Sequence, residues 1–181
     1  MSKDPSNHPT EFESKLETVL TRQLAGCVSL LSAERLSGGA SQETYCLRIK
    51  DSSAEKGERM LALRRAAGGL SHEKSDQQKT DRQRVEKGYP GLATEALLMQ
   101  SARAAGVPEP EIYYVLTQQD GLGDGFIMEW LQGEALGARI VRSPKFEHLR
   151  PKLAYQCGQY MARIHGIDLQ ATGLDRRLTT L

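Results

Sequence analysis

The chain has 181 residues, 39% hydrophobic and 26% charged, a composition that suits a globular protein of about one domain and excludes the fibrous and disordered classes. Its 24 basic and 23 acidic residues are mixed along the sequence, and a net charge of +1 disfavours the one-sided basic surface of a nucleic-acid binder. No apolar run approaches the roughly 20 residues that cross a bilayer, so we expect a cytoplasmic protein without nucleic-acid or membrane partners.

The first predicted element is a helix over about residues 11–24. Thr10 and Glu13 have the T-x-x-E spacing of a capping box, in which each side chain accepts a hydrogen bond from the backbone N–H of the other residue. We interpret residues 1–26 as an N-terminal helical extension. The helix is predicted from apolar side chains that recur at helical spacing: Phe12, Leu16, Val19, Leu20 and Leu24.

Three strands follow, over about residues 28–36, 43–49 and 60–65. The first two flank the small-residue stretch 37–41, and the second alternates strictly between apolar and other side chains. Alternation with period two around a glycine-rich turn is typical of a β-hairpin. The sequence therefore predicts a three-stranded antiparallel meander.

Residues 66–89 contain mainly Gly, Ser, Gln and charged residues, with almost no apolar side chain to bury. We expect a mobile surface loop here. Loops of this length inside a compact domain are often functional, and long surface insertions are also well tolerated. Both interpretations stay open.

The next predicted helix begins at Pro90 and Gly91 and runs to about Ala105, with Gly106 placed to end it. Strands are predicted over residues 111–117 and 125–130, which brings the sheet to five strands. Further helices follow, and the last residues carry no pattern. The expected ranges of these final segments are 135–141 and 149–167 for the helices and 170–181 for the tail.

The cysteines Cys27, Cys46 and Cys157 are widely spaced and form no Cys-x-x-Cys pair, which indicates neither a disulfide framework nor a zinc site. We expect each of them to be a small buried hydrophobic residue and not a catalytic thiol.

Five short motifs occur in order among these elements, and their order and spacing are more specific than any one of them. They are LSGGASQETY (36–45), LALRR (61–65), GLATE (91–95), GVPEP (106–110) and FIMEWLQG (126–133). Together with the order of elements they resemble the amino-terminal lobe of the protein-kinase-like fold. More narrowly, the chain resembles the aminoglycoside phosphotransferase family in its broad sense, including the branch joined to acyl-CoA dehydrogenase domains.

The resemblance implies an α+β fold. Residues 27–131 would form the nucleotide-binding N-terminal lobe, with a five-stranded antiparallel sheet plus a helix. Residues 132–181 would be the first helices of an incomplete C-terminal lobe.

A glycine loop between two strands lets backbone N–H groups approach phosphate oxygens without an intervening Cβ. Gly38, Gly39 and Ser41 are the candidates for this role. The alternative is a plain hairpin turn, because Gly-Gly is a common hairpin signal.

Ala62 and Arg64 are two residues apart on a strand and therefore point to the same face. The resemblance places Ala62 under the adenine. It places Arg64 where kinases carry the lysine that holds the α and β phosphates and pairs with a helix glutamate, here Glu95. Arginine is a departure from that pattern, since a guanidinium offers a bidentate fork in place of a point charge. Alternatively, Glu95 is an ordinary solvated glutamate favoured by the helix dipole.

Met128, Glu129 and Leu131 resemble the hinge between kinase lobes, whose backbone groups bond the purine edge. Met128 would lie at the back of the base pocket, whereas Trp130 is equally explained as a packing anchor. The implied cofactor is ATP or GTP, with Mg²⁺ only when the second lobe is present.

Phosphoryl transfer needs a carboxylate near the acceptor hydroxyl and a protein-held Mg²⁺. In the family these come from a His-Gly-Asp loop followed by Asn and then a metal-binding Asp, and the sequence to Leu181 contains no such loop. His165 and Asp168 lack the His-x-Asp spacing of a catalytic loop, so we reject Asp168 as a catalytic base.

We therefore expect a fragment of a phosphotransferase that acts on a small-molecule hydroxyl, inactive alone and with no catalytic residue of its own. Its terminal helices would expose apolar faces that favour self-association. The alternatives are a non-catalytic kinase-like module that binds a nucleotide, a CoA-like ligand or a protein, and a purely structural interaction domain.

Overall fold

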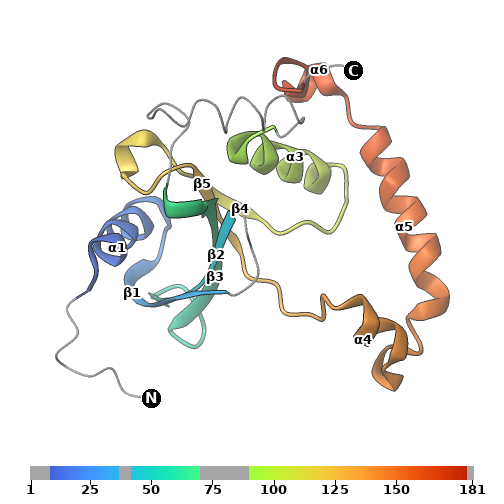
Figure 1. The fold of residues 1–181 in the computed structure, drawn as a ribbon, viewed down its shortest axis with the longest axis horizontal. Coiled ribbons are helices and arrows are strands. Elements are labelled where there is room, and N and C mark those ends of the chain that lie inside the picture. The colour runs from blue at the N-terminus through green and yellow to red at the C-terminus, as the bar shows by residue number, and fades with distance from the viewer. Residues whose placement is uncertain (1–8, 37–41, 70–89, 179–181) are drawn as a thin grey trace. The chain divides into compact units, whose positions relative to one another are not determined.

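A computed structural model of the chain describes residues 9–36, 42–69 and 90–178. Within these ranges five strands form a single sheet in which every neighbouring pair is antiparallel, and helices complete the structure (Figure 1). The predicted α+β class with a five-stranded antiparallel sheet is confirmed.

Two compact units make up the chain. The first comprises Met1–Ala96 and Ile112–Trp130 and contains the whole sheet. The second comprises Leu97–Glu111 and Leu131–Leu181. Helix α3, Leu92–Ala104, begins in the first unit and continues in the second.

Helix α1, Glu11–Gln23, begins at the predicted capping box. The backbone N–H of Thr10 donates to Glu13 Oε2 at 2.8 Å, and the N–H of Glu13 donates to Thr10 Oγ1 at 3.2 Å. The helix ends where Leu24 turns extended, with φ −106° and ψ 115°. Thus local side-chain chemistry decides where α1 begins.

The five strands follow the order β1-β2-β3-β5-β4, so the predicted meander of β1, β2 and β3 is extended by a second antiparallel pair. Strand β5 pairs with β3 on one side and with β4 on the other, so it lies between them although it follows β4 in the chain. The strand bounds are Cys27–Arg35 for β1, Gln42–Asp51 for β2, Glu58–Ala66 for β3, Ile112–Val115 for β4 and Gly125–Glu129 for β5.

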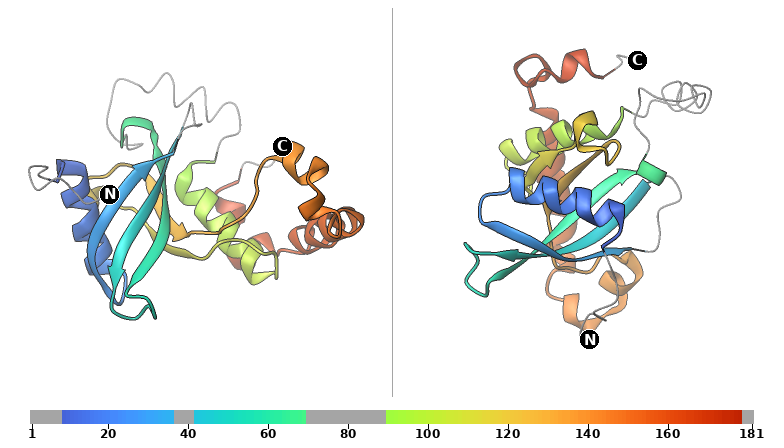
Figure 2. Two further views of the ribbon diagram at one scale, coloured as in Figure 1. Left: turned by 90° about the horizontal axis from the view of Figure 1, so that it is seen from below. Right: turned by 90° about the vertical axis from the view of Figure 1, so that its left-hand side faces the viewer.

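One face of the sheet packs against α1, as Figures 1 and 2 show. In β2 every second residue from Glu43 to Asp51 is buried, and the residues between them are not. This confirms the predicted alternation. Burying a large aliphatic side chain contributes about 1.5–3 kcal/mol. The residues with the lowest exposure in this core are Leu16, Leu20, Leu47, Ile49, Leu61, Leu63 and Ile127, all at 0%.

A buried carboxylate joins α1 to the turn between β4 and β5. Asp120 accepts hydrogen bonds from the Thr117 N–H at 2.7 Å, the Thr117 hydroxyl at 2.9 Å and the Tyr114 hydroxyl at 3.0 Å, and it also pairs with Arg22 of α1. Burial acts to raise the pKa of Asp120, but these donors outweigh it and hold the pKa below its usual value.

The predictions around the long polar segment need two corrections. Ala66 belongs to β3, and Ala67–Gly69 form a short 3₁₀ turn, so the predicted loop does not start at residue 66. The remainder of that loop, residues 70–89, lies outside the described residues. Helix α3 begins at Leu92 and not at Pro90, because Gly91 has φ 80°, which is incompatible with a helical turn.

Gly106 ends α3 as predicted. Its φ is 84°, and the N–H of Val107 donates to the carbonyl of Ala102 at 3.0 Å, a backbone closure that favours glycine at the helix end.

The second unit is mainly helical after Trp130. Helix α4 starts two residues later than expected, and the tail predicted to be without pattern contains a short helix, which Asp168 caps by accepting from the N–H groups of Gln170 and Ala171. The elements are α4 Gly137–Arg142, a 3₁₀ turn Pro144–Phe146, α5 Arg150–His165, α6 Leu169–Thr172 and a 3₁₀ turn Leu174–Arg176.

Helix α5 contains no buried residue, and Cys157 on it is exposed, so the prediction that this cysteine is buried is wrong. Cys27 and Cys46 are half-buried, and burial raises the pKa of both thiols, which keeps them protonated at neutral pH. In the described ranges no helix is both long enough and apolar enough to cross a membrane.

Candidate functional site

The candidate site lies on the face of the sheet opposite α1, around the middle strand β3. Ala62 of β3 is in register with Cys46 of β2 and Met128 of β5. Arg64, two residues further along, is in register with Thr44 and Phe126. Because alternate residues of a strand share a face, these side chains belong to one surface of the sheet.

Arg64 forms an ion pair with Glu95, the predicted helix carboxylate. Arg64 Nη1 lies 3.1 Å from Glu95 Oε1, and Glu95 stands in the first turn of α3, within the first compact unit. The two side chains are 37% and 21% exposed. Glu95 is therefore not merely a solvated first-turn glutamate, and the pair connects the middle of the sheet to α3.

Gln42 is a second partner of Arg64, and no sequence pattern predicted it. Arg64 Nε donates to Gln42 Oε1 at 2.6 Å. Gln42 is the first residue of β2 and lies two positions before Thr44, the register partner of Arg64. The alternation of β2, combined with the register, would have placed Gln42 on the same face as Arg64.

The two contacts hold the guanidinium by different nitrogens. Gln42 engages Nε and Glu95 engages Nη1, so acceptors from β2 and α3 together determine the plane of the group. A guanidinium has five N–H donors in a rigid fork. Arg64 remains 37% exposed, which leaves part of this fork accessible to a ligand from solvent.

The predicted base-binding residues are only partly brought together. Ala62 and Met128 are register partners on adjacent strands, with Ala62 4% exposed, and Glu129 ends β5 opposite Leu61. Leu131 is 55% exposed and belongs to the second unit, so its place in the predicted hinge stays a prediction. The predicted phosphate-binding residues Gly38, Gly39 and Ser41 lie outside the described residues, and that assignment stays a prediction.

A second buried carboxylate, Glu43, ties three strands together on the α1 face. It pairs with Arg65 of β3 at 2.8 Å and with Arg35 of β1 at 3.3 Å, and it accepts from the Tyr45 hydroxyl at 3.1 Å and the Gly68 N–H at 3.3 Å. Burial acts to raise the pKa of Glu43, but the donors and the Arg65 charge outweigh it and lower the pKa. The network fixes the ends of the strands that carry Gln42 and Arg64.

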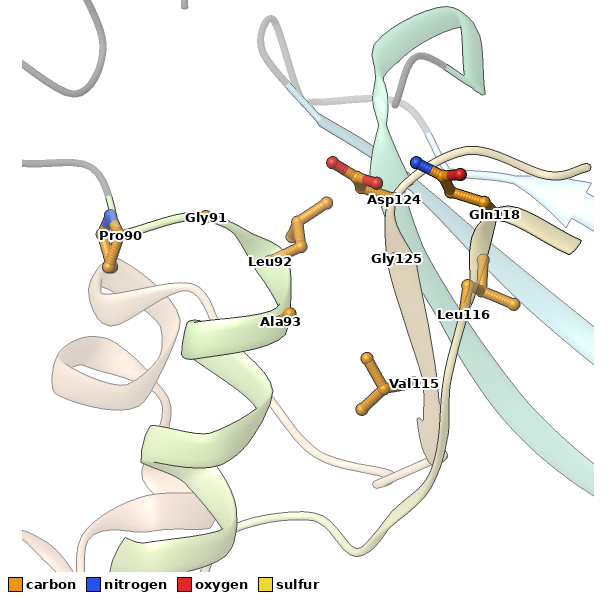
Figure 3. A pocket seen from close by; sticks show the side chains of 9 residues that line it. All are labelled: Pro90, Gly91, Leu92, Ala93, Val115, Leu116, Gln118, Asp124 and Gly125. Carbon is orange, nitrogen blue, oxygen red and sulfur yellow. The ribbon is translucent and has the colours of Figure 1, made fainter. Parts of the chain in front are cut away.

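A pocket of about 300 Å³ lies between the start of α3 and the β4–β5 pair. Figure 3 shows Leu92 extending from α3 toward the strands and Val115 extending from β4 toward the helix. None of the predicted site residues that the structure describes lines this pocket. Its lining residues are Pro90, Gly91, Leu92, Ala93, Val115, Leu116, Gln118, Asp124 and Gly125.

The chain was compared with models of known protein families. Residues 32–181 match the phosphotransferase enzyme family. The chain belongs to this family. The matched range includes Arg64, Gln42, Glu95 and the rest of the predicted site, which agrees with the resemblance found in the five motifs. No match to the chain was found among curated proteins.

In this member of the phosphotransferase enzyme family, the Arg64 guanidinium of β3 is paired with Glu95 of α3. Among residues 9–36, 42–69 and 90–178, no group of three or more His, Cys, Asp and Glu side chains is arranged as a metal site. The site that the described residues form is centred on the Arg64 guanidinium and its two acceptors, Glu95 and Gln42.

Proposed function

We propose that residues 27–131 bind ATP or GTP for a phosphotransferase that acts on a small-molecule hydroxyl, and that Arg64 holds the phosphates. The observation that carries this proposal is the 3.1 Å ion pair between Arg64 and Glu95 at the middle strand of the sheet. An arginine held in this way presents a fixed positive charge on the face where the family is expected to bind its nucleotide.

The physical chemistry of the pair favours phosphate binding. Glu95 offsets the cost of partly burying the guanidinium and orders a long side chain before the ligand arrives. The planar fork of Arg64 then donates charge-assisted hydrogen bonds to phosphate oxygens, often two in parallel. Such bonds contribute about 1.5–3 kcal/mol each.

The base would lie further along the same strands, near Ala62 and Met128. Ala62 is two residues from Arg64, about 7 Å along a strand, so a ribose would lie between the base and the phosphates. Mg²⁺ would accompany the nucleotide and neutralise part of the phosphate charge, and none of the described residues is assigned to it. The 181 residues contain no His-Gly-Asp sequence, so we propose that they bind nucleotide without transferring phosphate by themselves.

The test is a calorimetric titration of ATP with Mg²⁺, repeated with GTP, against the wild-type chain and Arg64→Ala. We expect Arg64→Ala to weaken binding at least about tenfold, the effect of losing one hydrogen bond to a charged group. Arg48→Ala is the matched control, because Arg48 lies on β2 in an exposed pair with Glu58.

Equal affinity in the wild type and Arg64→Ala would remove Arg64 from the site. Absence of ATP and GTP binding in both proteins would contradict the proposal and favour a module that binds a CoA-like ligand or a protein, or a purely structural domain.

A further inference from the structure

Two side chains bind the Arg64 guanidinium, and one of them is the expected glutamate, Glu95. The other, Gln42, accepts from Nε at 2.6 Å. We propose that Gln42 is a positioning residue that aims the Arg64 guanidinium at the phosphates of the bound nucleotide. The proposal rests on the nucleotide-binding function proposed above and deepens it.

A second contact matters because the cation is an arginine. A single ion pair through Nη1 leaves the guanidinium free to rotate about that contact, and ordering a long side chain costs rotamer entropy. A further acceptor at Nε fixes the plane of the fork. A lysine ammonium is a compact charge without an Nε–H edge, so it would draw little benefit from Gln42 in this position.

The geometry explains why a glutamine stands at this position. Arg64 is in register with Thr44, and Gln42 is the diagonal neighbour two residues away on the same face. Diagonal neighbours on adjacent strands are about 7–8 Å apart, within reach of long side chains only. Asparagine is one methylene shorter and would not bridge the gap without movement of the backbone.

The test compares Gln42→Met with the wild-type chain in titrations of ATP with Mg²⁺ and of adenosine. Methionine keeps the length of the side chain and removes the amide acceptor. We expect ATP affinity to fall about fivefold to tenfold and adenosine affinity to stay unchanged, because adenosine has no phosphate. Arg48→Met, on the same strand in the exposed pair with Glu58, is expected to leave both affinities unchanged.

A double-mutant cycle with Arg64→Lys distinguishes positioning of the Arg64 guanidinium from a general effect of Gln42→Met on the sheet. In the Arg64→Lys background, Gln42→Met is expected to change ATP affinity less than about twofold, because the Nε–H donor is already absent. Gln42→Asn is expected to reproduce the loss seen with Gln42→Met in the arginine background, which provides a second variant if methionine impairs folding.

The inference is overturned if Gln42→Met leaves ATP affinity unchanged, weakens ATP and adenosine equally, or costs the same in both backgrounds. If the wild type binds ATP and Arg64→Ala loses it in any of these cases, only the role of Gln42 fails. If the wild type binds no nucleotide, the proposed function and this inference fail together.

Discussion

Asp120 is a buried carboxylate whose hydrogen bonds come from several residues, and it lies away from the candidate site. Its side chain is 0% exposed, pairs with Arg22 and accepts from both donors of Thr117 and from Tyr114. A buried charge is tolerated only when its hydrogen-bonding capacity is filled. Asp120 therefore connects α1, through Arg22, to the turn before β5, through Thr117.

Replacing Asp120 tests this role. Asp120→Asn keeps the size of the side chain but puts an amide N–H₂ against groups that are themselves donors. We expect the free energy of unfolding to fall by about 2–3 kcal/mol, measured by urea denaturation. Glu55→Gln, at an exposed position, is the control and should stay within about 0.5 kcal/mol of the wild type. An Asp120→Asn protein as stable as the wild type would show that the network contributes nothing.

Individual site residues differed in how far the sequence could predict them. Arg64 and Glu95 were both predicted from their motifs, and the structure pairs them. Gln42 was missed although it stands inside the quoted motif, because a polar residue at the start of a strand carries no signal by itself. Its role becomes visible only when the register of β2 against β3 is known.

Among the elements, α1 shows how local chemistry sets a boundary. The capping box satisfies backbone N–H groups that no carbonyl of the helix can reach. The helix in turn buries Leu16, Val19 and Leu20 against the sheet. A cap that stabilises the start of α1 therefore also stabilises the packing of this helix on the sheet.

Thr10→Ala removes the side-chain half of this box. We expect a loss of about 1 kcal/mol in the free energy of unfolding, followed by urea denaturation monitored by circular dichroism. Thr10→Ser keeps the hydroxyl and should retain most of that energy. If alanine and serine at this position behave alike, the cap is not what stabilises α1.

The elements with the longest sequence patterns were predicted well, whereas the short helix α6 was not predicted. The alternation of β2 and the apolar stripe of α1 extend over ten or more residues, enough for the pattern to stand out. Helix α6 has 4 residues and depends on the Asp168 cap, so no periodicity indicates it. The start of α3 was misplaced because Gly91 adopts a backbone conformation that its sequence neighbours do not reveal.

At the scale of the whole molecule, three buried carboxylates make the first unit sensitive to acid. The pKa of Asp120 and that of Glu43 are lowered by donors that outweigh burial. The pKa of Asp51 is lowered chiefly by the hydroxyl of Ser53. Each ionised carboxylate therefore binds protons less readily in the folded than in the unfolded chain, so it stabilises the fold when deprotonated.

The pH dependence follows from the sign of these shifts. The ordinary values are 3.8 for Asp and 4.5 for Glu. The stabilisation is complete above those values and is lost as pH falls through the lower folded-state pKa of each group. We expect urea midpoints to be steady from about pH 7 to pH 5 and to fall steeply below about pH 4. Midpoints that hold or rise toward pH 3 would contradict the assignment.

The family and the positions of the longer elements could be predicted from the sequence, because caps, periodicities and ordered motifs are patterns in the order of residues along the chain. The fold pairs Arg64 with Glu95 as the motifs predicted. The place of β5 beside β3 and the hydrogen bond between Gln42 and Arg64 became known only from the folded structure. Those outcomes depend on the register and packing of separate elements, whose partners are far apart in the chain and leave no local pattern.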